Sequence, residues 1–150
     1  MNEYEIKEIY VDGYERIAKL KKMDSGEDFI VHFLEYDEYL DNRKESEKKK
    51  IGDIIEGDIS IDLVTVNRKI DLGVMHKQVI ENSSHIEAVV EVSRIVDNYS
   101  AYVFSSISND EVLVEFESEV DYKEGDRVFI EGSLVLCQDL VQNKMRGSAS

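Results

Sequence analysis

The sequence contains a single cysteine, Cys137, and neither proline nor tryptophan among its 150 residues. One cysteine excludes an internal disulfide and every zinc site built from four thiolates. Cys137 follows Leu134-Val135-Leu136 without an adjacent basic residue that would activate its thiol, so we expect it to be buried and inert. A reducing cytoplasm is the compartment that fits this cysteine usage best.

Long apolar stretches are also missing. No run approaches the roughly 20 apolar residues that a membrane-spanning helix needs. The N-terminal residues 1–5 do not show the basic and then apolar pattern of a signal peptide. We therefore expect a cytoplasmic protein with no membrane partner, and we expect residues 146–150 to form a flexible tail.

The chain lacks the sequence patterns of common catalytic sites. It contains no glycine-rich phosphate loop, no His-Glu-x-x-His pattern and no Gly-x-Ser-x-Gly pattern. Its three histidines, His32, His76 and His85, are scattered along the chain. A hydrolase that uses paired carboxylates stays open, because spatial pairing cannot be seen in a sequence. We predict that the protein is not an enzyme, with no catalytic residues, no cofactor and no metal ligands.

Basic residues are scarce relative to acidic ones. The chain has 33 Asp and Glu against 18 Lys and Arg, which gives a net charge of −15. Disordered acidic chains lack β-branched and aromatic residues, whereas this chain is rich in Val, Ile, Tyr and Phe, so we expect it to fold. Such an excess of negative charge repels nucleic-acid phosphates and favours basic partners.

Alternating apolar and polar residues predict that the fold is mainly β. In residues 111–117, Val112, Val114 and Phe116 share one face of a predicted strand. Residues 58–63 show the same period. There we expect the apolar side chains to point inward, namely Ile59, Ile61 and Leu63. The polar side chains should point outward, namely Asp58, Ser60 and Asp62.

Turn signals between these runs favour a barrel or a sandwich. Asp12-Gly13 predicts a hairpin, and short strands separated by turns every 8–12 residues or so are typical of both architectures. Residues 74–84 could form a short helix that ends at Asn82. This segment also suggests a boundary between an N-terminal β-rich half, residues 1–81, and a second half, residues 82–145.

The two halves share a degenerate pattern. Residues 50–57 contain a Gly-Asp turn, a short strand and a Glu-Gly break before the strand at 58–66. Residues 123–132 repeat this order before the strand at 133–137, with a different spacing between the glycines.

With these closing strands, a long first strand and a hairpin, residues 85–137 resemble a small OB-fold β-barrel. Residues 5–66 resemble a weaker second copy. We therefore expect two small OB-like barrels, or one barrel or sandwich with a β-rich N-terminal extension, and one or two short helices.

The OB-fold resemblance implies binding of single-stranded nucleic acid or oligosaccharide. OB-folds bind single strands through a basic groove with stacking aromatics, a role open to Tyr99, Tyr102 and Phe104. However, residues 82–150 contain 13 acidic and 5 basic side chains, a net charge of −8. Since phosphate contacts supply most of such affinity, we do not expect nucleic acid as a partner.

The densest negative charge lies in residues 111–126. A divalent cation site, a contact surface for a basic protein and a solvated face are the three interpretations. We take the contact surface as the functional hypothesis, with these residues as candidates: Glu111, Glu115, Glu117, Glu119, Asp121, Glu124 and Asp126.

We therefore predict an acidic protein-binding module. Its most economical version is an inhibitor or immunity-type protein that neutralises a basic toxin or a nucleic-acid enzyme. The alternative is a structural or assembly module, of phage or a secretion apparatus, that forms homo-oligomers. The third hypothesis is an OB-type binder of nucleic acid or oligosaccharide.

Overall fold

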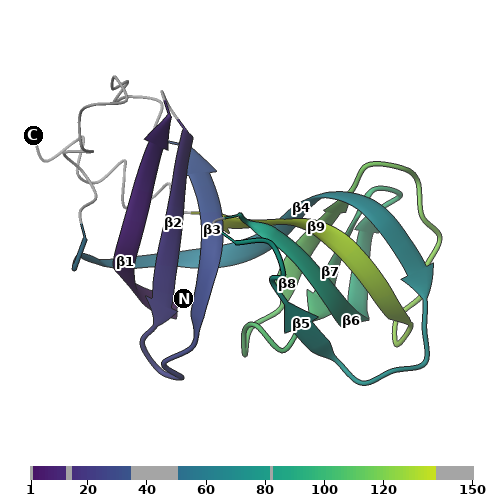
Figure 1. The fold of residues 1–150 in the computed structure, drawn as a ribbon. Helices are drawn as coiled ribbons and strands as arrows, with labels where there is room; N and C mark the ends of the chain where they lie inside the picture. The colour runs from purple at the N-terminus through teal and green to yellow at the C-terminus, as the bar shows by residue number, and fades with distance from the viewer. Residues whose placement is uncertain (1, 13–14, 35–50, 82, 138–150) are drawn as a thin grey trace, which may run out of the picture.

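The computed structural model describes residues 2–12, 15–34, 51–81 and 83–137, and the statements below concern these residues (Figure 1). They form the following strands: β1 (Asn2–Asp12), β2 (Glu15–Lys22), β3 (Asp28–Leu34), β4 (Ile54–Lys69), β5 (Met75–Lys77), β6 (His85–Asp97), β7 (Ser100–Phe104), β8 (Val112–Phe116) and β9 (Arg127–Cys137). The described part of the chain therefore confirms a mainly β fold.

The prediction of one or two short helices is wrong for the described residues, none of which is helical. Accordingly, no helix among them is long and apolar enough to cross a membrane. Within the segment 74–84, residues 75–77 instead pair with β6, Met75 opposite Val89 and Lys77 opposite Glu87. A helix this short is marginal in water, so pairing with a neighbouring strand satisfies the backbone better. The predicted tail at 146–150 and the side chain of Cys137 lie outside the described residues.

All nine strands belong to one sheet, so the expectation of two separate barrels is wrong. The strand order is β1-β2-β3-β9-β4-β8-β7-β6-β5, and additional pairings join β1 to β4 and β9 to β6. These two pairings bend the sheet back on itself into a ring-like arrangement. The division of the chain at residue 82 stays a prediction.

Two closed circuits of paired strands arise from this topology, and both contain β4 and β9. The first circuit is β1-β2-β3-β9-β4, and the second is β6-β7-β8-β4-β9. At 16 residues, β4 is long enough to pair with β1 near its start and with β8 further along. Figure 1 shows β4 running from the three N-terminal strands into the second group of strands. Each half of the chain thus completes its circuit with a strand from the other half.

The Gly-Asp turns noticed in the sequence make equivalent contacts in the two circuits. The backbone N–H of Ile6 donates to the carbonyl of Asp53 at 2.9 Å, and the carbonyl of Ile6 accepts from the N–H of Gly52 at 2.8 Å. The backbone of Val92 makes the same two bonds, at 2.9 and 2.8 Å, with Gly125-Asp126. Both glycines have positive φ angles, 94° and 88°, which explains glycine at these turns. The two halves are therefore a structural repeat at this point.

The alternation predicted for residues 58–63 fails at Ser60 and at Leu63. Ile59 and Ile61 are buried, but Leu63 is 53% exposed and Ser60 is buried. Leu63 has a φ of 53°, and the pairing of β4 with both β8 and β9 shifts register around it. This irregularity inserts extra residues into β4, so Val64 takes the inward position that Leu63 was predicted to hold.

The alternation predicted for residues 111–117 is confirmed. Val112, Val114 and Phe116 are buried, and the intervening side chains of β8 lie on the outer face. The hairpin predicted at Asp12-Gly13 is also confirmed, because β1 and β2 pair in antiparallel fashion up to Asp12 opposite Glu15. Neither Glu-Gly break ends a strand, since Gly57 lies inside β4 and Gly132 inside β9.

Candidate functional site

Of the seven candidate acidic residues, Glu111 immediately precedes β8, Glu115 lies on β8, and the other five lie in the connection from β8 to β9. Two of them are neutralised within the fold. Arg94 Nε lies 3.6 Å from Glu111 Oε1, and the hydroxyl of Ser93 donates to the other carboxylate oxygen. Lys69 Nζ lies 3.4 Å from Asp126 Oδ1. These two carboxylates are thus held by internal partners.

Glu115, in contrast, lies among like charges. Because β4 and β8 run parallel with Ile61 opposite Val114, Asp62 is placed beside Glu115 on the outer face. The pKa of Glu115 is raised, first by partial burial and then by the negative charges of Asp62 and Asp97. We call Asp62, Asp97 and Glu115, which come from β4, β6 and β8, the acidic row.

Hydrogen bonds hold the outer members of the acidic row in place. Asp97 accepts from the backbone N–H of Tyr99 and from the hydroxyl of Ser100, both at 2.8 Å. These bonds lower the pKa of Asp97, so its negative charge persists well below neutral pH. The Ser60 hydroxyl donates to Asp62 at 3.2 Å. The acidic row is therefore a fixed source of negative potential.

Exposed apolar and aromatic groups adjoin the acidic row in the chain. Leu63 follows Asp62 and is 53% exposed, and Tyr99 lies two residues after Asp97 and is 49% exposed. The Tyr99 hydroxyl lies 3.5 Å from a carboxylate oxygen of Glu119. A hollow of about 470 Å³ adjoins them and is lined by Asn67, Asn98, Glu119, Val120, Asp121 and Tyr122. Tyrosine is enriched at protein contact surfaces, and the exposed Leu63 side chain adds apolar area that a partner could cover.

Replacing Glu115 by glutamine should stabilise the protein at neutral pH. An acid whose pKa is raised on folding holds its proton more tightly in the folded state, so its ionisation lowers the free energy of unfolding as pH rises. We expect a gain of about 0.5 kcal/mol at pH 7, small because solvent screens this exposed group, and no gain at pH 3. Thermal unfolding at both pH values measures it. The control Glu111→Gln weakens the pair with Arg94 and should give no stabilisation at pH 7. An equal gain in both variants would contradict this account.

The aromatic residues considered for nucleic-acid stacking differ in exposure and in their contacts. Phe104 is 48% exposed on β7, whereas Tyr102 is half-buried with the guanidinium of Arg94 4.1 Å from its ring centre. Arg94 is also the ion-pair partner of Glu111. The cation that lies on the Tyr102 ring is thus already paired with a carboxylate.

His76 links both circuits through two hydrogen bonds that the sequence did not indicate. Its Nε2 lies 2.7 Å from Glu27 Oε2, between β2 and β3, and its Nδ1 lies 2.6 Å from the Ser106 hydroxyl, between β7 and β8. Such a serine, histidine and carboxylate series is used in nucleophilic catalysis. Ser106, however, does not line the hollow of about 500 Å³ that Glu27 and His76 border. We interpret the series as a bridge between the two circuits.

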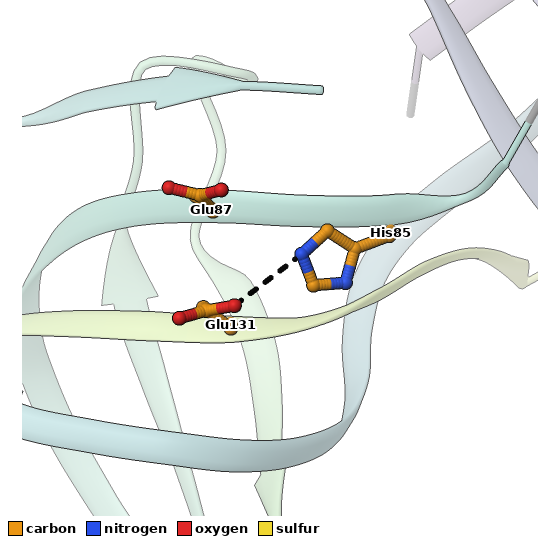
Figure 2. Close-up of side chains that lie close together, drawn as sticks. All are labelled: His85, Glu87 and Glu131. Carbon is orange, nitrogen blue, oxygen red and sulfur yellow. Dashed lines mark ion pairs between the residues drawn. The ribbon is translucent and has the colours of Figure 1, made fainter. Parts of the chain in front are cut away.

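His85 lies beside two carboxylates where β6 pairs with β9. His85 and Glu87 are on β6, and Glu131 is on β9 (Figure 2). His85 Nε2 lies 3.4 Å from Glu131 Oε1, and the three residues offer ligand atoms within 4.8 Å of one another. This cluster was missed because the sequence places Glu131 far from His85. The only local signal was His85-x-Glu87, whose spacing puts both side chains on one face of a strand.

No protein-family model, no curated protein and no solved structure matches this chain. What the protein does must therefore be inferred from its own residues.

Proposed function

We propose that the protein binds a basic protein partner through the acidic row and the exposed groups beside it. The observation that carries this proposal is that the pairing of β4 with β8 places Asp62 beside Glu115, whose pKa is raised by partial burial and then by the charges of Asp62 and Asp97. Like charges on neighbouring strands destabilise a sheet. Arrangements that lower the stability of a protein are often retained because its function needs them. A cationic partner would relieve the repulsion within the acidic row.

An inhibitor or immunity-type protein that neutralises a basic toxin or nucleic-acid enzyme fits these properties best. The net charge of −15 would accelerate encounter with a cationic partner through long-range attraction. Charge pairs that lose water at the contact would then slow dissociation. Tyr99, which is 49% exposed, supplies a rigid aromatic anchor of the kind that adds affinity at such surfaces.

The OB-like resemblance is compatible with this proposal. The second circuit, β6-β7-β8-β4-β9, closes on itself, which supports an OB-type arrangement around residues 85–137. The acidic row has the wrong charge for phosphate, so nucleic acid ranks behind a basic protein. A neutral oligosaccharide would gain nothing from the negative charge and ranks behind as well.

Assembly into homo-oligomers is the second candidate, and a different observation favours it. β5 ends the strand order and pairs only with β6 in the described sheet. Exposed apolar side chains surround this three-residue strand: Leu72, Met75, Val79 and Ile80, each more than 40% exposed. An edge strand with apolar neighbours can pair with another copy. Light scattering at several concentrations tests for it, and a stable homo-oligomer that captures no basic protein would favour assembly.

Neutralising the acidic row should slow association with the partner. The variant Asp62→Asn/Asp97→Asn/Glu115→Gln removes three charges, while the amide oxygen at position 97 can still accept the bond from Tyr99. With a basic partner captured from the native host, we expect the association rate at low salt to fall about tenfold and its salt dependence to weaken. Surface plasmon resonance over a range of ionic strengths measures both quantities.

A matched control removes three other exposed charges, those of Glu3, Asp28 and Asp71. The net charge of the two triple variants is the same, so only the position of the lost charges differs. The control should retain most of the association rate. Equal slowing in both variants, or an association rate indifferent to ionic strength, would contradict a role for the acidic row.

A further inference from the structure

Three potential metal ligands are brought to one place by the pairing of β6 with β9. His85 and Glu87 are two residues apart on β6, so their side chains leave the same face of the sheet. β9 places Glu131 directly opposite Glu87. The pairing runs without interruption over residues 85–91 and 127–133, and regular strands hold ligands more rigidly than loops do.

We infer that His85, Glu87 and Glu131 form a site for a divalent transition-metal ion of the zinc type. Two ligands bound about 2.1 Å from a tetrahedral ion lie roughly 3.4 Å apart. His85 Nε2 and Glu131 Oε1 have this separation, 3.4 Å, and rotation of the Glu87 side chain would bring the third ligand in from within 4.8 Å. An imidazole nitrogen with two carboxylates favours zinc over calcium or magnesium, which prefer oxygen ligands alone.

The charges of the cluster also favour a cation. Glu87 and Glu131 lie opposite each other on neighbouring strands, an arrangement of like charges that destabilises a sheet. Lys77 Nζ, on β5, lies 3.8 Å from Glu87 Oε1 and partly offsets this repulsion. A bound ion would replace Lys77 in that role, so the lysine and the metal compete for Glu87.

Access and coordination number suit an exchangeable ion. The side chains of His85, Glu87 and Glu131 are 29%, 22% and 32% exposed, so each is partly buried and still reached by solvent. Three protein ligands leave a fourth tetrahedral position for water or for a ligand from a second molecule.

The pair of His76 and Glu27 provides an internal control. Its separation is shorter, 2.7 Å, but the other ring nitrogen of His76 is bonded to Ser106. The pair has only one carboxylate. Among the described residues, the group of three possible metal ligands is that of His85, Glu87 and Glu131, and His76 belongs to no such group. Two histidine–glutamate pairs in one protein thus differ in whether a third ligand is present.

Zinc titration of the full-length protein, followed by calorimetry and by competition with a chromophoric chelator, tests the inference. We expect one Zn²⁺ per chain that excess Mg²⁺ does not displace. His85→Gln and Glu131→Gln should each weaken zinc binding about tenfold or more, as loss of a ligand does. His76→Gln should leave the affinity unchanged. Lys77→Met should tighten zinc binding, because it removes the competing ammonium group.

Co²⁺ absorption in the visible range gives a second readout, since ligand loss changes the spectrum even where affinity changes little. Thermal unfolding without metal checks that each variant folds. If a ligand variant fails to fold, the zinc affinity of Lys77→Met still tests the site. Zinc binding that His85→Gln and Lys77→Met both leave unchanged would overturn the site. So would zinc binding that Mg²⁺ displaces at equal concentration, which would show only general attraction of cations to an acidic protein.

Discussion

Replacing Gly132 by alanine should destabilise the protein by about 3 kcal/mol, at the upper end of the usual cost of overpacking. A Cβ atom at this position would lie 2.7 Å from the backbone carbonyl oxygen of Asp62. It would also lie 2.9 Å from Val64 and 3.0 Å from Ile61, two fully buried side chains of β4. The closest of these atoms belongs to the backbone, so β4 and β9 would have to separate where both circuits share them.

Urea denaturation measures this effect, and Gly73→Ala is the matched control. A Cβ at position 73 would meet nothing within 4 Å, and the residue does not have a positive φ. Its replacement should change the free energy of unfolding by less than about 0.5 kcal/mol, as surface substitutions usually do. Similar small changes in both variants would show that β4 and β9 are not packed as tightly as this geometry requires.

Dividing the chain between residues 81 and 82 should yield two fragments that do not fold alone but fold when mixed. Residues 1–81 contain β4 but lack β9, and residues 82–150 contain β9 but lack β4. Each circuit needs both strands. In an isolated fragment, fully buried side chains such as Ile61 or Leu134 would be exposed to water, and each would lose roughly 1.5–3 kcal/mol of burial.

Amide chemical-shift dispersion and cooperative thermal unfolding of each fragment, alone and mixed, measure this outcome. The intact chain should unfold in one transition, so signals from residues of the first and of the second circuit should be lost at the same temperature. A dispersed spectrum and cooperative unfolding of residues 82–150 alone would show instead that the second half is an independent domain.

Sharing of strands also affects the proposed function. Asp62 comes from the first half of the chain, whereas Asp97 and Glu115 come from the second. The acidic row therefore exists only when both halves are folded together, and binding of a basic partner should be lost with either fragment alone.

Local patterns in the sequence were enough to predict the class of the fold and some of its strands. Val112, Val114 and Phe116 alternate with polar residues, and a period of two needs no knowledge of the neighbouring strands. Asp12-Gly13 marked a hairpin for the same reason, because a tight turn is specified by its own residues. The acidic segment 111–126 was visible as well, since charge can be counted along a chain.

Contacts between distant strands decided the rest. The exposure of Leu63 depends on how β4 pairs with β8 and β9 at once, which no local period contains. The same non-local pairing places Asp62 beside Glu115, and Glu131 beside His85. The sequence by itself determined a β-rich, acidic protein, whereas only the tertiary structure decided which carboxylates meet. The physical reason is that strand register is set by packing of the whole sheet, and each site draws its residues from strands far apart in the chain.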